Sequence, residues 1–129
     1  MLKKMQKFWK QQKGFTLVEL LAVIAILGII VAIAVPAIGN VIAGAEDDAD
    51  EANIELIENA ARLADVSGEF TDDEDGMTVA ELHSTGYLEE IPSNPADDNQ
   101  VYAGSVTKNE DGIFAYTESW EEVSTDENQ

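Results

Sequence analysis

The sequence predicts an α+β protein in which one long N-terminal α-helix packs on a small antiparallel β-sheet head. Three observations predict this class. Residues 15–45 are nearly all apolar, residues 45–66 repeat apolar side chains at helical spacing, and residues 100–107 and 112–119 alternate like strands on either side of a turn. A chain of 129 residues is long enough for one small domain.

The first 14 residues, MLKKMQKFWKQQKG, form a basic leader. They contain five lysines and no Asp or Glu, whereas the remaining residues carry Arg62 and Lys108 against all 26 acidic residues, a net charge of −24. A basic start followed by an apolar run is a membrane-targeting arrangement that holds the lysines on the cytoplasmic side. The acidic remainder lacks the basic patch that phosphate contacts require, so we expect no binding of nucleic acid.

Residues 15–45 form the second part, an apolar helix. From Leu20 to Gly39 there are 20 residues without a charge, and at about 1.5 Å per residue such a helix spans a hydrocarbon core of roughly 30 Å. Gly28 lies in its middle and Pro36 near its outer end. Pro36 has no N–H for the carbonyl four residues back, so it should kink or loosen the helix.

Residues 46–129 form the third part, in which the helix continues to about Ala64. Its apolar stripe is predicted from residues that recur at gaps of three and four, with an acidic opposite face. The predicted stripe consists of Ala49, Ala52, Leu56, Ala60 and Leu63, widened by Ile57 and Ala64. One helix from about Phe15 to Ala64 would be roughly 75 Å long, far more than a head of this size can cover.

The head that follows is predicted from shorter signals. Residues 67–76 should form a loop, and residues 78–86 a short helix, with Thr78 and Glu81 in capping-box spacing and Gly86 as its end. Residues 87–99 read as an irregular crossing. Strands 100–107 and 112–119 should be joined by a hairpin turn at KNEDG, and residues 121–129 should be frayed.

Glu19 decides between three interpretations of the first 45 residues. It lies in an apolar run, where a carboxylate costs several kcal/mol unless something pairs with it. A secretory signal cut after Ala45 explains the lysines, but it does not explain Glu19 or an apolar run about twice the usual length. A plain signal anchor leaves Glu19 equally unexplained, since an intramembrane acid is by default functional and paired.

The third interpretation rests on the motif KGFTLVE, residues 13–19, which resembles the class III-type leader of type IV prepilins and the related pseudopilins. The resemblance implies that a membrane peptidase cuts between Gly14 and Phe15 and that Phe15 becomes the N-methylated first residue. Glu19 is then the fifth residue of the mature chain, where this family keeps its glutamate. Gly28 and Pro36 stand where many of these pilins have a glycine and a proline, and the expected long helix with a small sheet resembles their fold.

The resemblance implies that Glu19 pairs with the new ammonium of Phe15. In a filament the Phe15 ammonium belongs to a neighbouring subunit. The implied function is a structural, non-enzymatic subunit of a type IV pilus-like filament, whose partners are copies of itself, prepilin peptidase and an assembly platform. It would lie in the cytoplasmic membrane before assembly and on the cell surface afterwards. The alternatives are a pseudopilin of a type II secretion or competence DNA-uptake machine and, from another class, a secreted acidic binding protein. A further alternative for Glu19 is snorkelling at the membrane edge.

The other candidate sites are weaker. Around Asp72, Asp73, Glu74 and Asp75, an EF-hand alignment on Gly76 puts Thr71 and Leu82 where acids are needed. Two interpretations stay open, a solvated loop and a non-EF calcium loop, the latter either here or around Asn94, Asp97 and Asp98. We expect no other cofactor. His83 is the single histidine in a chain without cysteine, so we expect a surface residue and no catalytic or metal site. The aromatic side chains of the head should pack its core; they are Phe70, Tyr87, Tyr102, Phe114, Tyr116 and Trp120.

Overall fold

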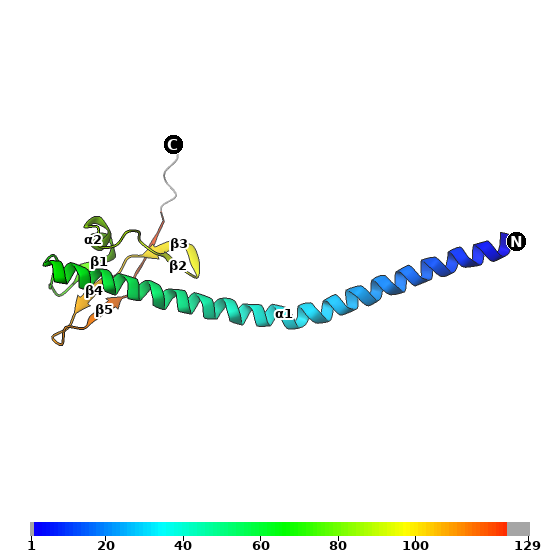
Figure 1. The fold of residues 1–129 in the computed structure, drawn as a ribbon, viewed down its shortest axis with the longest axis horizontal. Helices are drawn as coiled ribbons and strands as arrows, with labels where there is room; N and C mark the ends of the chain where they lie inside the picture. The colour runs from blue at the N-terminus through cyan, green and yellow to red at the C-terminus, as the bar shows by residue number, and fades with distance from the viewer. Residues whose placement is uncertain (1, 124–129) are drawn as a thin grey trace, which may run out of the picture. The chain divides into compact units, whose positions relative to one another are not determined.

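The computed structural model describes the backbone of residues 2–123 and the side chains of residues 16–123. Contacts divide the chain into two compact units, residues 1–43 and 44–129. Helix α1 (Leu2–Ser67) supplies the whole of the described first unit and continues into the second (Figure 1). The α+β class is confirmed, because α1 is followed by a short helix and two small antiparallel sheets. The cut after residue 14 that would separate the leader stays a prediction.

The end of α1 is built by a glycine. The helix continues to Ser67, three residues beyond the predicted end, and Gly68 follows it with a φ of +80°. The Gly68 N–H donates to the Asp65 carbonyl at 3.0 Å, and the Glu69 N–H donates to the Ala64 carbonyl at 2.9 Å. These bonds satisfy carbonyls that the last turn would otherwise leave open.

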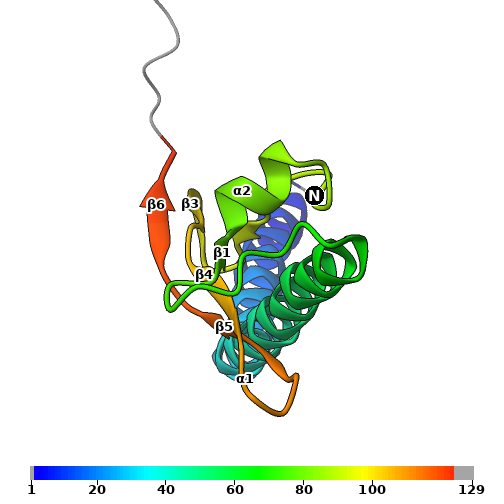
Figure 2. The same cartoon turned by 90° about the vertical axis from the view of Figure 1, so that its left-hand side faces the viewer.

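Two three-stranded sheets make up the head, where the sequence predicted one. The first sheet has the order β1–β4–β5, from β1 (Met77–Thr78), β4 (Ser105–Lys108) and β5 (Phe114–Thr117). The second has the order β2–β3–β6, from β2 (Ser93–Asn94), β3 (Asp97–Tyr102) and β6 (Trp120–Glu122). All the pairings are antiparallel. Figure 2 shows β3 and β6 of the second sheet side by side.

The predicted strand 100–107 is wrong as a single strand, because the chain changes sheets at Ala103 and Gly104. A Cβ on Gly104 would lie 1.8 Å from the Thr117 carbonyl oxygen and 2.8 Å from the Tyr116 ring. Only glycine therefore fits where the two sheets separate. Two other predictions were partly wrong: the irregular crossing contains β2 and the start of β3, and the predicted frayed end contains most of β6. Residues 124–129 lie outside the described part.

The local signals for the short helix and the hairpin are confirmed. Helix α2 (Val79–Ser84) begins after Thr78, whose backbone N–H donates to the Glu81 carboxylate at 2.8 Å while the Glu81 N–H donates to the Thr78 hydroxyl at 3.2 Å. The Thr78 N–H and, to a smaller extent, the Thr78 hydroxyl, which donates to the same carboxylate at 2.8 Å, lower the pKa of Glu81. The β4–β5 hairpin closes through the Asn109 N–H, which donates to the Ile113 carbonyl at 3.0 Å.

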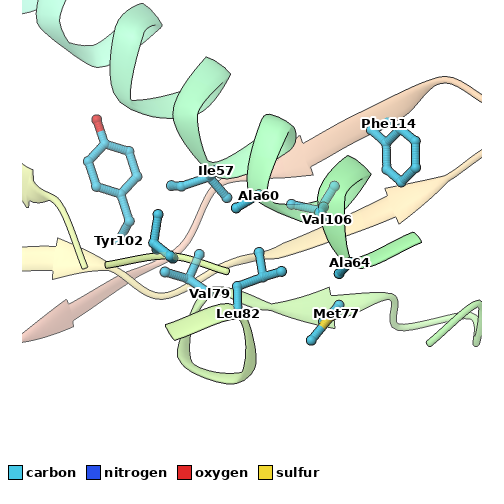
Figure 3. Close-up of a cluster of buried hydrophobic side chains, with 11 residues drawn as sticks. Ile57, Ala60, Ala64, Met77, Val79, Leu82, Tyr102, Val106 and Phe114 are labelled. Atoms are coloured by element: carbon cyan, nitrogen blue, oxygen red, sulfur yellow. The ribbon is translucent and has the colours of Figure 1, made fainter. Parts of the chain in front are cut away.

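The hydrophobic core lies between α1 on one side and the two sheets and α2 on the other (Figure 3). From α1 it takes Ile57, Ala60, Ala61 and Ala64, and from the rest of the head it takes Met77, Val79, Leu82, Leu88, Tyr102, Val106 and Phe114. The buried face of α1 is therefore rotated around the helix axis relative to the predicted stripe. Ile57 is fully buried, whereas Leu56 is 50% exposed and Leu63, Ala49 and Ala52 are also exposed. The predicted aromatic packing is confirmed, because the other four aromatic side chains are partly buried against this core.

Candidate functional site

The candidate site begins at the N-terminal segment of α1. The backbone of Gly14 and Phe15 belongs to α1, and the Phe15 side chain lies outside the described residues. Glu19 is exposed on the same helix, four residues after Phe15. Positions four apart lie one above the other on a helix face, separated by about 6 Å along the axis. The backbone therefore places Phe15 and Glu19 on one face, within reach of one another once a charge appears at Phe15.

The helix that carries Glu19 is apolar on every side. All sixteen Leu, Ile and Val side chains from Leu17 to Ile42 are at least 51% exposed. Within the described residues, one helix is long and apolar enough to cross a membrane, and none of its most apolar 18-residue window is buried. A helix that is apolar all round needs lipid or protein around it, because water would face the whole apolar surface.

Gly28 and Pro36 lie inside this helix. A Cβ on Gly28 would meet nothing within 4 Å, so packing within this chain does not require a glycine there. The α-helix is continuous through Pro36, so no break follows from the proline in this structure. Pro36 nevertheless has no N–H to donate to the Ala32 carbonyl four residues back. The proposed role of both residues in loosening the helix stays a prediction.

A row of carboxylates on α1 joins the helix to the sheets, which sequence reasoning missed. The Tyr102 hydroxyl donates a hydrogen bond to Asp50, the Tyr116 N–H donates to Glu58 at 3.1 Å, and Lys108 forms an ion pair with Asp65 at 2.8 Å. The hydrogen bond to Asp65 raises the pKa of Lys108. The acidic face of the helix was predicted to point away from the head, but these three acids border the packed face. The one signal available was that Lys108 is the single lysine of an acidic head.

The remaining candidates in the head are His83 and the acidic loop before β1. Among the side chains of residues 16–123, no group of three or more His, Asp or Glu lies close enough together to hold a metal ion. His83 is exposed on α2, as predicted for a surface residue. Asp72 to Asp75 are exposed in the loop before β1, and Gly76 closes that loop with a φ of +67° beside the Val106 carbonyl.

Comparison with known protein families identifies the N-terminal segment. Residues 9–35 match the family model described as the prokaryotic N-terminal methylation motif, the class III leader of type IV pilins. The matched range contains Gly14, Phe15, Glu19 and Gly28 and ends just before Pro36. No solved structure gives a significant match to the chain. The match shows that residues 9–35 carry the leader motif of type IV pilin-like and pseudopilin-like precursors, and this motif together with the apolar helix supports membrane anchoring.

Proposed function

We propose, from the premise that this chain is a type IV pilin-like precursor, that it is the structural subunit of a surface filament. Prepilin peptidase cuts it between Gly14 and Phe15 and methylates the new amine. The mature chain is then anchored in the cytoplasmic membrane until it polymerises through its N-terminal helix into an extracellular filament. The observation that carries the proposal is the methylation motif placed directly at the start of an entirely exposed apolar helix.

The role of Glu19 follows from the cut. Cleavage creates an ammonium at Phe15, and Glu19 lies one helical turn away, so it partly neutralises that charge within the membrane-bound monomer. In a filament core that excludes water, Glu19 pairs with the Phe15 ammonium of a neighbouring subunit. A subunit docked out of register would bury an unpaired charge, so the pair acts against wrong registers.

The apolar side chains have a role in both environments. In the membrane they contact lipid, and in the filament they contact the helices of other subunits. Both surroundings remove from water the side chains that the isolated chain leaves more than half exposed. The head forms the outer surface, has no enzymatic activity, and contributes the acidic charge of the filament.

The decisive experiment is mass spectrometry of the mature N-terminus from the native host, combined with electron microscopy of the cell surface. A chain that starts at N-methylated Phe15 and builds long fibres supports the proposal. A chain that starts near Glu46 would instead identify a secreted acidic protein. Correct processing without long fibres would favour a pseudopilin of a secretion or DNA-uptake machine.

A further inference from the structure

A groove with an apolar floor runs along one flank of α1, between the helix and the segment 87–92. Two adjoining hollows with volumes of about 750 and 420 Å³ share Leu56 and Glu90 as lining residues. We call this surface the Leu56 groove, and define it by Leu56, Tyr87, Leu88, Glu90, Ile91 and Pro92. It lies wholly within the unit 44–129.

The Leu56 groove combines apolar exposure with acidic edges. Leu56 remains 50% exposed in its middle, and Leu63 is exposed two turns further along the same helix face. Glu89 and Glu90 are exposed at the edge of the groove. Apolar surface rimmed by charge on an otherwise acidic head is the pattern of an interaction site, and its charge selects a basic partner.

The two cations of the head lie on the other flank of α1, among the acidic side chains of Glu58 and Asp65. The Arg62 guanidinium and the Lys108 ammonium lie 5.9 Å and 5.6 Å from the centre of the Phe114 ring. These are the two cations of residues 15–129. Lys108 is already paired with Asp65, whereas Arg62 is exposed and hydrogen-bonds to the neutral Asn59 side chain at 2.8 Å. Within the part of the chain whose side chains are described, Arg62 forms no ion pair.

The two surfaces are separated around the helix. Six residues from Leu56 to Arg62 correspond to a rotation of about 120° between their side chains. Figure 2 shows α2 and the β4–β5 hairpin on opposite sides of the end of α1. Ile113, beside Phe114 in that hairpin, is 58% exposed and adds an apolar side chain next to Arg62 and Lys108, while Glu110 and Asp111 occupy the hairpin turn.

We propose that the Leu56 groove of one copy receives the surface around Arg62 and Ile113 of a second copy, with the Arg62 guanidinium facing Glu90. The inference rests on the proposed filament function and names one contact between its heads. A guanidinium can bind a carboxylate through two parallel hydrogen bonds, which fixes orientation as well as attraction. Because the Arg62 surface and the groove lie on different flanks, the contact is heterologous, the type that extends an open helical filament when the rotation between copies does not close a ring.

A charge exchange in the full-length chain tests the contact. Arg62→Glu and Glu90→Arg should each reduce the filament protein sheared from cells about fivefold or more, because each places like charges together at every repeat. The double variant should restore the yield, because it recreates the pair with the charges exchanged. As a matched control, Glu121→Arg on β6 should not rescue Arg62→Glu.

A disulfide test locates the contact directly. The chain has no cysteine, so any disulfide in the variant carrying both Arg62→Cys and Glu90→Cys is engineered. Mild oxidation of its filaments should give a ladder of covalent oligomers, whereas the pair Ala80→Cys with Glu90→Cys should not. Three results would overturn this inference alone, provided that the wild-type chain forms filaments. They are normal yields from the single charge variants, a double variant that is not rescued, and the absence of a ladder. Absence of filaments from correctly expressed wild-type chain would instead overturn the proposed function.

Discussion

The Tyr102 hydroxyl donates its hydrogen bond to the Asp50 carboxylate, which ties β3 to α1 across 52 positions of the sequence. Tyr102 is 1% exposed, and the centre of its ring lies 4.5 Å from the centre of the Trp120 ring. Burial is the main cause that raises the pKa of Tyr102, and the bond to Asp50 adds to it. Burial likewise raises the pKa of Tyr116. The Tyr102 hydroxyl must therefore keep its proton to hold β3 against α1 through this hydrogen bond.

We expect Tyr102→Phe to destabilise the head by about 2 kcal/mol, because it removes a hydrogen bond to a charged acceptor. Near-ultraviolet circular dichroism of the full chain in detergent, followed through thermal unfolding, measures this loss. Tyr87→Phe is the control, because its hydroxyl bond to Glu69 at 2.8 Å is exposed, and we expect a loss below about 1 kcal/mol.

The same residue predicts how stability depends on pH. Since the folded pKa of Tyr102 lies above its unfolded value of about 10, its stabilising effect is complete below pH 10 and is lost as the pH rises beyond that. Wild-type melting temperatures should therefore fall above pH 10. The fall should be shallower in Tyr102→Phe, with the remainder due to Tyr116 and to Lys108, whose pKa values are also raised. An identical alkaline slope in both proteins would contradict the assignment.

Neighbouring residues on α1 should respond differently to truncation. Ile57→Ala should cost about 3 kcal/mol, because Ile57 is fully buried in the core. Leu56→Ala should cost about 1 kcal/mol or less, because half of its side chain already faces water. Thermal unfolding of both variants checks the orientation of the helix. If Leu56→Ala were the more damaging, the packed face of α1 would be wrong.

Gly14→Val should leave an uncut chain in the membrane and no filament, because a bulky side chain should not fit the peptidase at the cut. Mass measurement of the membrane protein would show the 14 leader residues still attached. Gly44→Val is the matched control, since a Cβ there meets nothing within 4 Å and the position lies far from the cut. Normal mature protein from Gly14→Val would rule out this cleavage site.

Glu19→Ala should be cut and inserted normally but should fail to assemble. Each docking step would bury an unpaired Phe15 ammonium, a loss of about 3–5 kcal/mol per subunit. Sheared filament yield, compared with the processed membrane pool, measures the defect, and Glu55→Ala serves as an acid-to-alanine control. Expression together with wild type should partly restore incorporation, because the intact amine of the variant can meet a wild-type Glu19. Normal filaments from Glu19→Ala alone would contradict the charge pair.

Pro36 should mark a loosened segment of the helix in the filament. The Ala32 carbonyl has no partner at Pro36, and unsatisfied backbone groups are costly away from water, so assembly should let such carbonyls find other partners. A map of the filament at near-atomic resolution tests this. Unbroken helical hydrogen bonds from Ile24 to Asn40, apart from the bond that proline itself lacks, would contradict the prediction.

The features that the sequence alone determined are local. The methylation motif, the apolar length of the first helix, the Thr78–Glu81 capping box and the β4–β5 turn each depend on residues within a few positions of one another. Such signals act through neighbouring backbone groups, or are read by an enzyme that contacts one short segment. They could therefore be predicted without knowledge of the tertiary structure.

Only the tertiary structure decided which face of α1 is buried and where the strands divide. Leu56 and Ile57 are both apolar at helical spacing, and only the position of Tyr102, Val106 and Phe114 against the helix selects Ile57 for the core. The bonds of Asp50, Glu58 and Asp65 join residues 43 to 58 positions apart. The sheet change at Gly104 depends on the approach of Thr117. These features arise where distant segments meet, and periodicity within one segment carries no information about its partner.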